Sequence, residues 1–207
     1  MRLQARERPV CHLLCSRRSW FKSMARFTFR SGRAFALVLV SFSLTGADTP
    51  PIVHYAPVEN LENIDVALIE KAGQKIDIAA YVLTDWPVIS ALIRAAERGV
   101  RVRVYLGAKQ FGGEQTAPLL HELISIPGVE VRFKHVGSPL MHLKSYQIDG
   151  RWLRTGAANF SASGLKRQDN DLLVIESAAA AAAFERRFEA MFAQGQSLPS
   201  DEGEPSP

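Results

Sequence analysis

The sequence predicts an α/β fold, a sandwich in which helices flank a mixed central β-sheet. After the first 50 or so residues, segments that alternate apolar and polar residues are followed by segments whose apolar residues recur at helical spacing. The chain of 207 residues is 47% hydrophobic and 22% charged, which is typical of a globular protein with a sizeable core. We therefore expect one domain, over residues 48–194.

The first half of this domain is expected to alternate between strand and helix. Residues 51–55 and 75–83 are predicted to be strands, and residues 60–73 an amphipathic helix with Gly73 as its C-cap. The next helix has clear end signals, because Asp85 is a good N-cap and Pro87 suits a first turn. The elements that follow are expected in this order: the end of that helix at Gly99, a strand at 100–107, a glycine-containing loop at 108–115, a helix at 117–126, a strand at 129–133, a β-hairpin, a strand at 171–177, a helix at 178–194 and a disordered tail at 195–207.

Residues 1–47 differ from the rest of the chain and resemble an export signal. Three arginines after Met24 precede an apolar stretch at 34–44, and small residues lead up to Ala47. The apolar stretch is short for a bilayer span, although an uncleaved anchor is the alternative. We expect translation to start at Met24, cleavage after Ala47, and a periplasmic or secreted protein. Both cysteines, Cys11 and Cys15, precede this cleavage site, so the exported chain needs no disulfide.

The leader also changes the meaning of the net charge. The chain carries +4 overall, but residues 1–47 hold nine of the 25 Lys and Arg and only one of the 21 acids. The remainder has 16 bases and 20 acids, so the basic balance of the whole chain is no evidence for nucleic-acid binding. The segment from Arg94 to Arg167, however, contains twelve Lys and Arg residues and only five Asp and Glu residues. This segment forms either a positive face for an anionic substrate or ordinary solvated surfaces.

The hairpin region, residues 139–161, carries the groups that suggest chemistry. His142 and Lys144 fall on one face of a strand, and Asp149-Gly150 favours a two-residue turn. A pair between Ile148 and Arg151 would put Lys144 opposite Thr155 and His142 opposite Ala157. The following loop would then bring Asn159 close to the His-Lys pair.

These three side chains suit phosphodiester cleavage. An imidazole can attack phosphorus or protonate a leaving oxygen, a lysine offers positive charge to phosphoryl oxygens, and an asparagine donates an oriented N–H. A unit charge pair about 4 Å apart contributes roughly 4 kcal/mol at an effective dielectric of 20. The alternatives are a partly exposed strand pair for His142 and Lys144, and a loop-capping role for Asn159.

The pattern His142-x-Lys144-x4-Asp149, followed by Gly156-x-x-Asn159, resembles the HKD motif of the phospholipase D superfamily. The chain is similar to the small single-motif members, especially bacterial periplasmic endonucleases, over nearly the whole length after the leader. The resemblance implies the phospholipase D-like sandwich with one motif per chain. It also implies that His142 forms a phosphohistidine without a metal or another cofactor. Because such sites use two motifs, it implies a homodimer in which a second copy supplies the other histidine.

The sequence departs from the family pattern at two places. Ala157 stands where a serine often follows the glycine, and Asn170 stands where a glutamate often begins the last strand, with Asp171 beside it. Asn170 or Asp171 would orient the histidine, and the sequence does not choose between them. For Asp149, the parity and the turn favour a structural role over a catalytic one.

Outside this motif, the signals are weaker. Lys166 and Arg167 either hold phosphates or belong to a solvated loop. The other histidines show no metal-ligand spacing with each other or with nearby carboxylates, so we expect no metal site. A nuclease acting on DNA or RNA is the leading function, a phospholipase or cardiolipin-type hydrolase is the alternative, and an inactive nucleic-acid-binding module is the second alternative.

Overall fold

The computed structural model describes residues 49–108 and 117–197, all within one compact unit of the chain. The predicted export leader at 1–47, most of the predicted glycine-containing loop and most of the predicted polar tail lie outside the described residues. The strands are β1 (Ile52–Ala56), β2 (Lys75–Ala80), β3 (Arg101–Leu106), β4 (Val129–Phe133), β5 (Lys144–Ile148), β6 (Trp152–Thr155) and β7 (Asn170–Glu176). The helices are α1 (Leu61–Ile69), α2 (Trp86–Glu97), α3 (Ala117–Ser125), α4 (Ala162–Lys166) and α5 (Ala178–Ala193).

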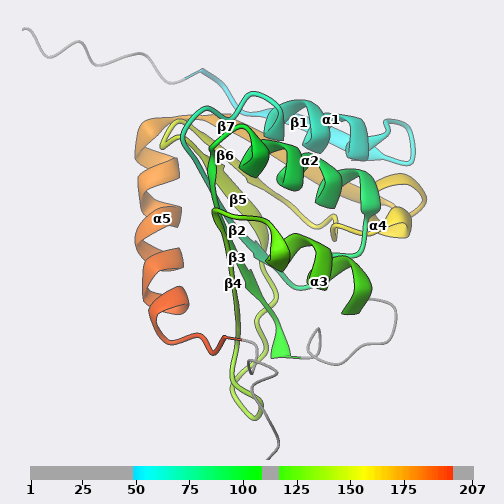
Figure 1. Cartoon of the computed structure of the whole chain (residues 1–207). Helices are drawn as coiled ribbons and strands as arrows, with labels where there is room; N and C mark the ends of the chain where they lie inside the picture. Colours follow the sequence, from blue (N-terminus) through cyan, green and yellow to red (C-terminus); the bar gives the residue numbers. More distant parts are fainter. Residues whose placement is uncertain (1–48, 109–116, 198–207) are drawn as a thin grey trace, which may run out of the picture. The chain divides into compact units, whose positions relative to one another are not determined.

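The strands form one mixed sheet in the order β1-β7-β6-β5-β2-β3-β4. β2, β3 and β4 are parallel neighbours, while the pairings from β2 through β5, β6 and β7 to β1 are antiparallel. Helices α1 to α4 cover one face and α5 lies along the other (Figure 1). The predicted α/β sandwich with a mixed sheet is therefore confirmed.

Two apolar layers hold the helices on the sheet. The larger one packs β2, β3 and β5 against α1 and α2, and a smaller one packs Phe188 and Phe192 of α5 against Ala79 and Tyr105. Five of the six residues of β2 are buried, because a central strand is covered on both faces. The helix signals at α2 also act as expected, since the Asp85 side chain accepts from Val88 N and Gly99 has a φ of 89°.

Two local predictions were wrong, and the first concerns the end of α1. Asp149 accepts hydrogen bonds from the N–H groups of Gly73, Gln74 and Lys75 at 2.8, 2.9 and 2.8 Å. These bonds hold the segment after α1 in an open loop, so the helix is capped at Glu70 and not at Gly73.

The hairpin register is the second correction. Ile148 pairs with Trp152 and not with Arg151, which shifts the predicted pairing by one residue. Arg151 belongs to the turn, because its N–H donates to Ile148 O while its carbonyl accepts from Ser177 N. As a result Ser145, and not Lys144, meets Thr155, with 2.9 Å between their hydroxyl oxygens.

The sequence analysis missed one short helix. α4 occupies residues that were expected to form a loop, and the side chain of Ser161 caps it by accepting from Gly164 N at 3.1 Å. A glycine is needed at position 164, because a Cβ there would lie 2.6 Å from Asn159 O. This close approach packs α4 against the segment that carries Asn159.

Candidate active site at one edge of the sheet

The sheet register brings the motif residues other than Asp149 to one end of the strands, and we call this end the site edge of the sheet. β2, β3 and β4 end there, and β5 and β7 begin there. His142 lies two residues before β5, and the loop with Gly156 and Asn159 follows β6. Segments far apart in the sequence therefore meet at this edge.

His142 is exposed, and its ring lies against an aromatic side chain. The centroids of the His142 and Tyr81 rings are 4.7 Å apart, with an angle of 52° between the ring planes. Within the described part of the chain, the imidazole has no hydrogen-bond partner. Its nitrogens are thus accessible to a substrate.

Lys144, by contrast, is buried beneath the same tyrosine. Its Nζ donates to His142 O at 2.8 Å and lies 4.9 Å from the centroid of the Tyr81 ring. Burial lowers the pKa of the Lys144 ammonium. The structure therefore brings His142 and Lys144 together on one aromatic ring, as expected from their parity along the strand.

The Gly156 loop is held by the start of β7. Gly156 has a φ of 140°, and a Cβ there would lie 2.5 Å from Asp171 O, so this position requires glycine. The Asp171 carboxylate accepts from Ala157 N at 2.8 Å, and Asp171 O accepts from Ala158 N at 3.2 Å. Asp171 thus fixes the backbone that leads to Asn159.

Asn159 has an unsatisfied polar atom. Its Oδ1 is buried and accepts no hydrogen bond from any described residue, while its backbone carbonyl accepts from Ser161 N. A buried acceptor of this kind needs a donor from solvent or from a bound molecule. The structure shows no direct contact from Asn159 to His142 or Lys144 among the described residues.

The other proposed supporting residues contact other parts of the fold. Asn170 Nδ2 donates to Gly164 O at 2.9 Å, so Asn170 supports α4. Within the described chain no hydrogen bond joins Asn170 or Asp171 to the His142 ring. Asp149 lies at the opposite edge of the sheet, where it binds the loop before β2.

Lys166 and Arg167 differ in their surroundings. Lys166 forms an ion pair with Glu62, and its Nζ lies 3.9 Å from Asp85 Oδ2. Burial, together with Glu62, raises the pKa of Asp85 to about 6. Arg167 is exposed and has no acidic partner among the described residues, so it is the more accessible cation of the two.

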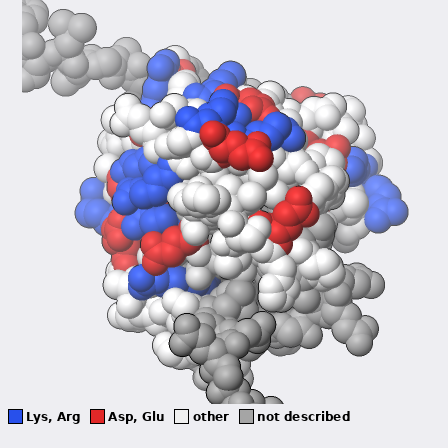
Figure 2. Space-filling model, viewed as in Figure 1, with Lys and Arg blue, Asp and Glu red and all other residues white. Residues whose placement is uncertain are grey.

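Most of the basic residues between Arg94 and Arg167 lie beside acidic side chains. Figure 2 shows separate groups of Lys and Arg, several of them beside Asp or Glu. Seven of these side chains have an acidic partner. They are Arg94, Arg98, Arg103, Arg132, Arg151, Arg154 and Lys166.

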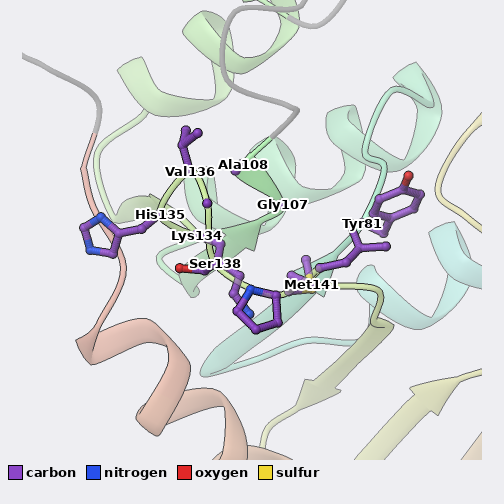
Figure 3. Close-up of a pocket in the computed structure, with 11 residues that line it drawn as sticks. Tyr81, Gly107, Ala108, Lys134, His135, Val136, Ser138 and Met141 are labelled. Atoms are coloured by element: carbon purple, nitrogen blue, oxygen red, sulfur yellow. The ribbon is translucent and has the colours of Figure 1, made fainter.

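A cleft of about 210 Å³ opens beside the histidine. Its walls are Tyr81, Gly107, Ala108 and residues 134–141, with His135 and Tyr81 on opposite sides (Figure 3). Val136 and Leu140, in the same loop, are 79% and 59% exposed. The cleft thus offers mainly apolar walls next to the candidate nucleophile.

The sequence analysis did not select three residues that shape this site. Tyr81 contacts both His142 and Lys144, and its place within the strand predicted over residues 75–83 was the only available signal. Arg154 and Asp65 form a fully buried ion pair behind the site, with 2.9 Å between Nε and Oδ1. Nothing in the local pattern marks that pair, because its members are 89 positions apart.

No group of three or more His, Cys, Asp or Glu residues that could hold a metal ion occurs in residues 49–108 and 117–197. None of the helices in those ranges is long and apolar enough to cross a membrane.

Comparison with known proteins gives one family match and several relatives. Residues 66–192 match the family described as "Cardiolipin synthase, PLD-like domain". The chain is 34% identical over 108 residues to the Phospholipase D of Rickettsia conorii, covering 52% of each chain. It is 32% identical over 122 residues to the Phospholipase D of Rickettsia prowazekii, covering 59% of this chain and 58% of that one. The chain thus spans about half the length of the curated relatives it matches.

Two solved structures share the fold over nearly their whole length. The first is a phospholipase D family member, Nuc from Salmonella typhimurium, with a TM-score of 0.67 and 23% identity over 73% of this chain and 99% of that one. The second is NucT from Helicobacter pylori, with a TM-score of 0.66 and 19% identity over 72% of this chain and 99% of that one. At these identities the likeness concerns the fold.

Proposed function

The chain belongs to the phospholipase D superfamily, and from this premise we propose that it is a phosphodiester hydrolase with His142 as its nucleophile. One observation carries the proposal: an exposed imidazole, with no hydrogen-bond partner among the described residues, contacts the same tyrosine ring as a buried lysine. The imidazole nitrogen would form a bond to phosphorus while the bond from phosphorus to the leaving oxygen breaks. Lys144 would stabilise the charge that develops on the phosphoryl oxygens.

The reaction requires a proton for the leaving oxygen and later an activated water. Because the chain has one HKD motif, we propose a two-fold homodimer in which the partner subunit's His142 takes part in both steps. Its imidazolium would protonate the leaving oxygen, and the neutral imidazole would then remove a proton from the attacking water. Water would then cleave the phosphohistidine bond, releasing the phosphate product and the free imidazole. This scheme uses no metal.

Nucleic acid is the first substrate candidate. It is supported by the resemblance to single-motif periplasmic endonucleases and by the exposure of His142, which leaves room for a polymer. Lys134 and Arg167, near the same edge, have no acidic partner among the described residues and suit phosphate contacts. With the export signal that the sequence predicts over residues 1–47, we propose a periplasmic or secreted enzyme.

Phospholipid is the second candidate, and specific observations favour it. The Rickettsia relatives carry the name Phospholipase D. The cleft beside His142 is mainly apolar, and Val136 and Leu140 are exposed next to it. An acyl chain needs apolar walls of this kind, whereas a base is recognised through polar edges and stacking.

A side-by-side assay tests the proposal. The full chain would be treated with EDTA and incubated with plasmid DNA and, separately, with labelled phospholipid vesicles, with His142→Ala as the control. Cleavage that survives EDTA and disappears in the variant is expected, and the substrate cleaved identifies the class. If neither DNA nor phospholipid is cleaved in a His142-dependent way, the proposal is overturned for these two substrates. The inactive binding module would then be the remaining hypothesis.

A further inference from the structure

We propose that Arg154 is a positioning residue that sets the Gly156–Asn159 loop against the strand carrying Lys144. Arg154 lies in β6 and is completely buried. It touches no substrate-facing atom, so it would act through the residues it holds. The inference rests on the proposed function of this site, but its structural part can be tested separately.

The planar Arg154 guanidinium forms hydrogen bonds to two segments of the site, the start of β5 and the loop after β6. Arg154 Nη1 donates to Lys144 O at 2.7 Å and to Ala158 O at 3.2 Å, and Nη2 also lies 3.3 Å from Ala158 O. Ala158 directly precedes Asn159, and Lys144 begins β5. The same nitrogen therefore fixes the backbone of both candidate residues.

The remaining donors of Arg154 orient the group itself. Nε and Nη2 each donate to a different oxygen of Asp65 in α1, both at 2.9 Å. Tyr146 OH donates to Asp65 Oδ1, also at 2.9 Å, and the ring of Phe160 lies 4.4 Å from Arg154 Cζ. All five N–H groups of the guanidinium thus have acceptors, which fixes its plane.

On one side Lys144 pairs with Ala80 of β2, but strand pairing does not join Lys144 to the loop after β6. The β5–β6 ladder ends with the pair Tyr146 and Arg154, so Lys144 and Ala158 have no such pairing with each other. A lysine at position 154 carries one ammonium and cannot reproduce the planar fork that serves Asp65 and both carbonyls.

The other face of the sheet supplies a matched control. Arg103 is also a buried arginine paired with a buried aspartate, with 2.6 Å between its Nε and Asp77 Oδ1. It lies over aromatic rings too, with its Cζ 5.1 Å from the Phe188 centroid. Among the described residues its hydrogen-bond partners are the acidic side chains of Asp77 and Glu189, and neither belongs to the Gly156–Asn159 loop. The two pairs share burial and chemistry but differ in contact with the site.

The experiment replaces each ion pair by apolar residues of similar size in the full chain. One variant carries Asp65→Leu and Arg154→Met, and the control carries Asp77→Leu and Arg103→Met, because such exchanges of buried pairs are often neutral for stability. Thermal unfolding, the amide hydrogen exchange of residues 156–160, and kcat and KM on bis(p-nitrophenyl) phosphate are measured for both. Arg154→Lys, which keeps the charge opposite Asp65, serves as the second test variant if the double variant does not fold.

We expect the Arg154 variants to exchange the loop amides at least tenfold faster and to lose about 100-fold in kcat, with KM changed little, because small displacements of reacting groups are costly. The control should keep wild-type loop exchange and kcat within about twofold. Unchanged loop exchange in the Arg154 variants, or an equal loss of kcat in both double variants, would overturn the inference. If the wild-type chain itself shows no turnover, the proposed function fails while the exchange data still decide the positioning role.

Discussion

At the scale of single residues, the surroundings of Lys144 beneath Tyr81 explain how its ammonium could bind a substrate phosphoryl oxygen beside the exposed His142. The Lys144 ammonium is buried, and among the described residues it contacts the His142 carbonyl oxygen and the face of the Tyr81 ring. A charge with so few partners is poorly solvated by the protein, which is why burial lowers its pKa. A phosphoryl oxygen would supply the missing counter-charge.

Lys144→Met tests this role. We expect kcat to fall by roughly 100-fold or more, as for the loss of one strong donor to a developing anion. The melting temperature should stay equal or rise, because an apolar side chain avoids the desolvation of a buried ammonium. Lys71→Met, at an exposed position near the end of α1, is the control and should change neither quantity. A large loss of melting temperature in Lys144→Met would show that Lys144 stabilises the fold.

Residue types and spacing predicted His142 and Lys144 as a pair, and the structure shows why this was possible. Both lie on one short segment, where side-chain parity alone decides which face they share. Arg154 and Tyr81 could not be found in the same way. Their importance comes from contacts between segments distant in sequence, which a local pattern does not contain.

At the scale of elements, the segment with Asn159 is held between α2 and α4. Phe160 O accepts from Thr84 N and Asp85 N, immediately before α2. Asp85 caps α2, and Lys166 of α4 lies near its free oxygen. The titration of Asp85 therefore influences both helices that flank the segment.

Asp85 should make stability depend on pH. Burial and the nearby Glu62 raise its pKa from 3.8 to about 6, with Lys166 and the N–H of Val88 opposing the shift. An acid whose pKa is higher in the folded chain stabilises the fold below its unfolded pKa and loses that contribution as the pH rises through its folded pKa. Asp85→Asn keeps a good N-cap without the charge.

The measurement is the melting temperature of wild type and Asp85→Asn between pH 4 and pH 8. We expect wild type to lose several degrees relative to the variant across about pH 4 to 7. Glu122→Gln, at an exposed position of α3, should follow the wild-type curve. Parallel curves for wild type and Asp85→Asn would show that Asp85 does not titrate in this range.

The elements themselves were largely predictable because caps and periodicity are local. The start of α2 at Asp85 is an example. The predicted end of α1 was wrong because the Asp149 carboxylate accepts hydrogen bonds from residues 74 to 76 positions away. The predicted hairpin register was wrong because the Arg151 carbonyl accepts a hydrogen bond from Ser177 N. Such long-range bonds override local preference.

At the scale of the whole molecule, the sheet order explains why one edge carries the site. β5 lies between β2 and β6, so the loops after β2 and β6 meet the segment before β5. The sequence predicts a mixed sheet but not this order. One such edge presents one copy of the HKD motif, and the proposed reaction needs two.

Subunit mixing tests the shared site. Wild type and His142→Ala would be unfolded together at equal amounts, refolded, and compared with wild type alone at the same total protein. If each active site needs both histidines, about one quarter of the activity remains, because only dimers of two wild-type chains work. About one half would indicate that each subunit acts alone. Sedimentation of the wild-type chain should also give twice the chain mass.

The most direct test of the central claim is to locate the covalent intermediate. The full chain would be mixed with the substrate it cleaves, quenched in alkali during turnover, digested, and analysed by mass spectrometry. We predict a phosphoryl adduct on the peptide containing His142, at His142 itself, and no adduct or turnover in His142→Ala. An adduct on a different residue, or continued cleavage by His142→Ala, would contradict the account.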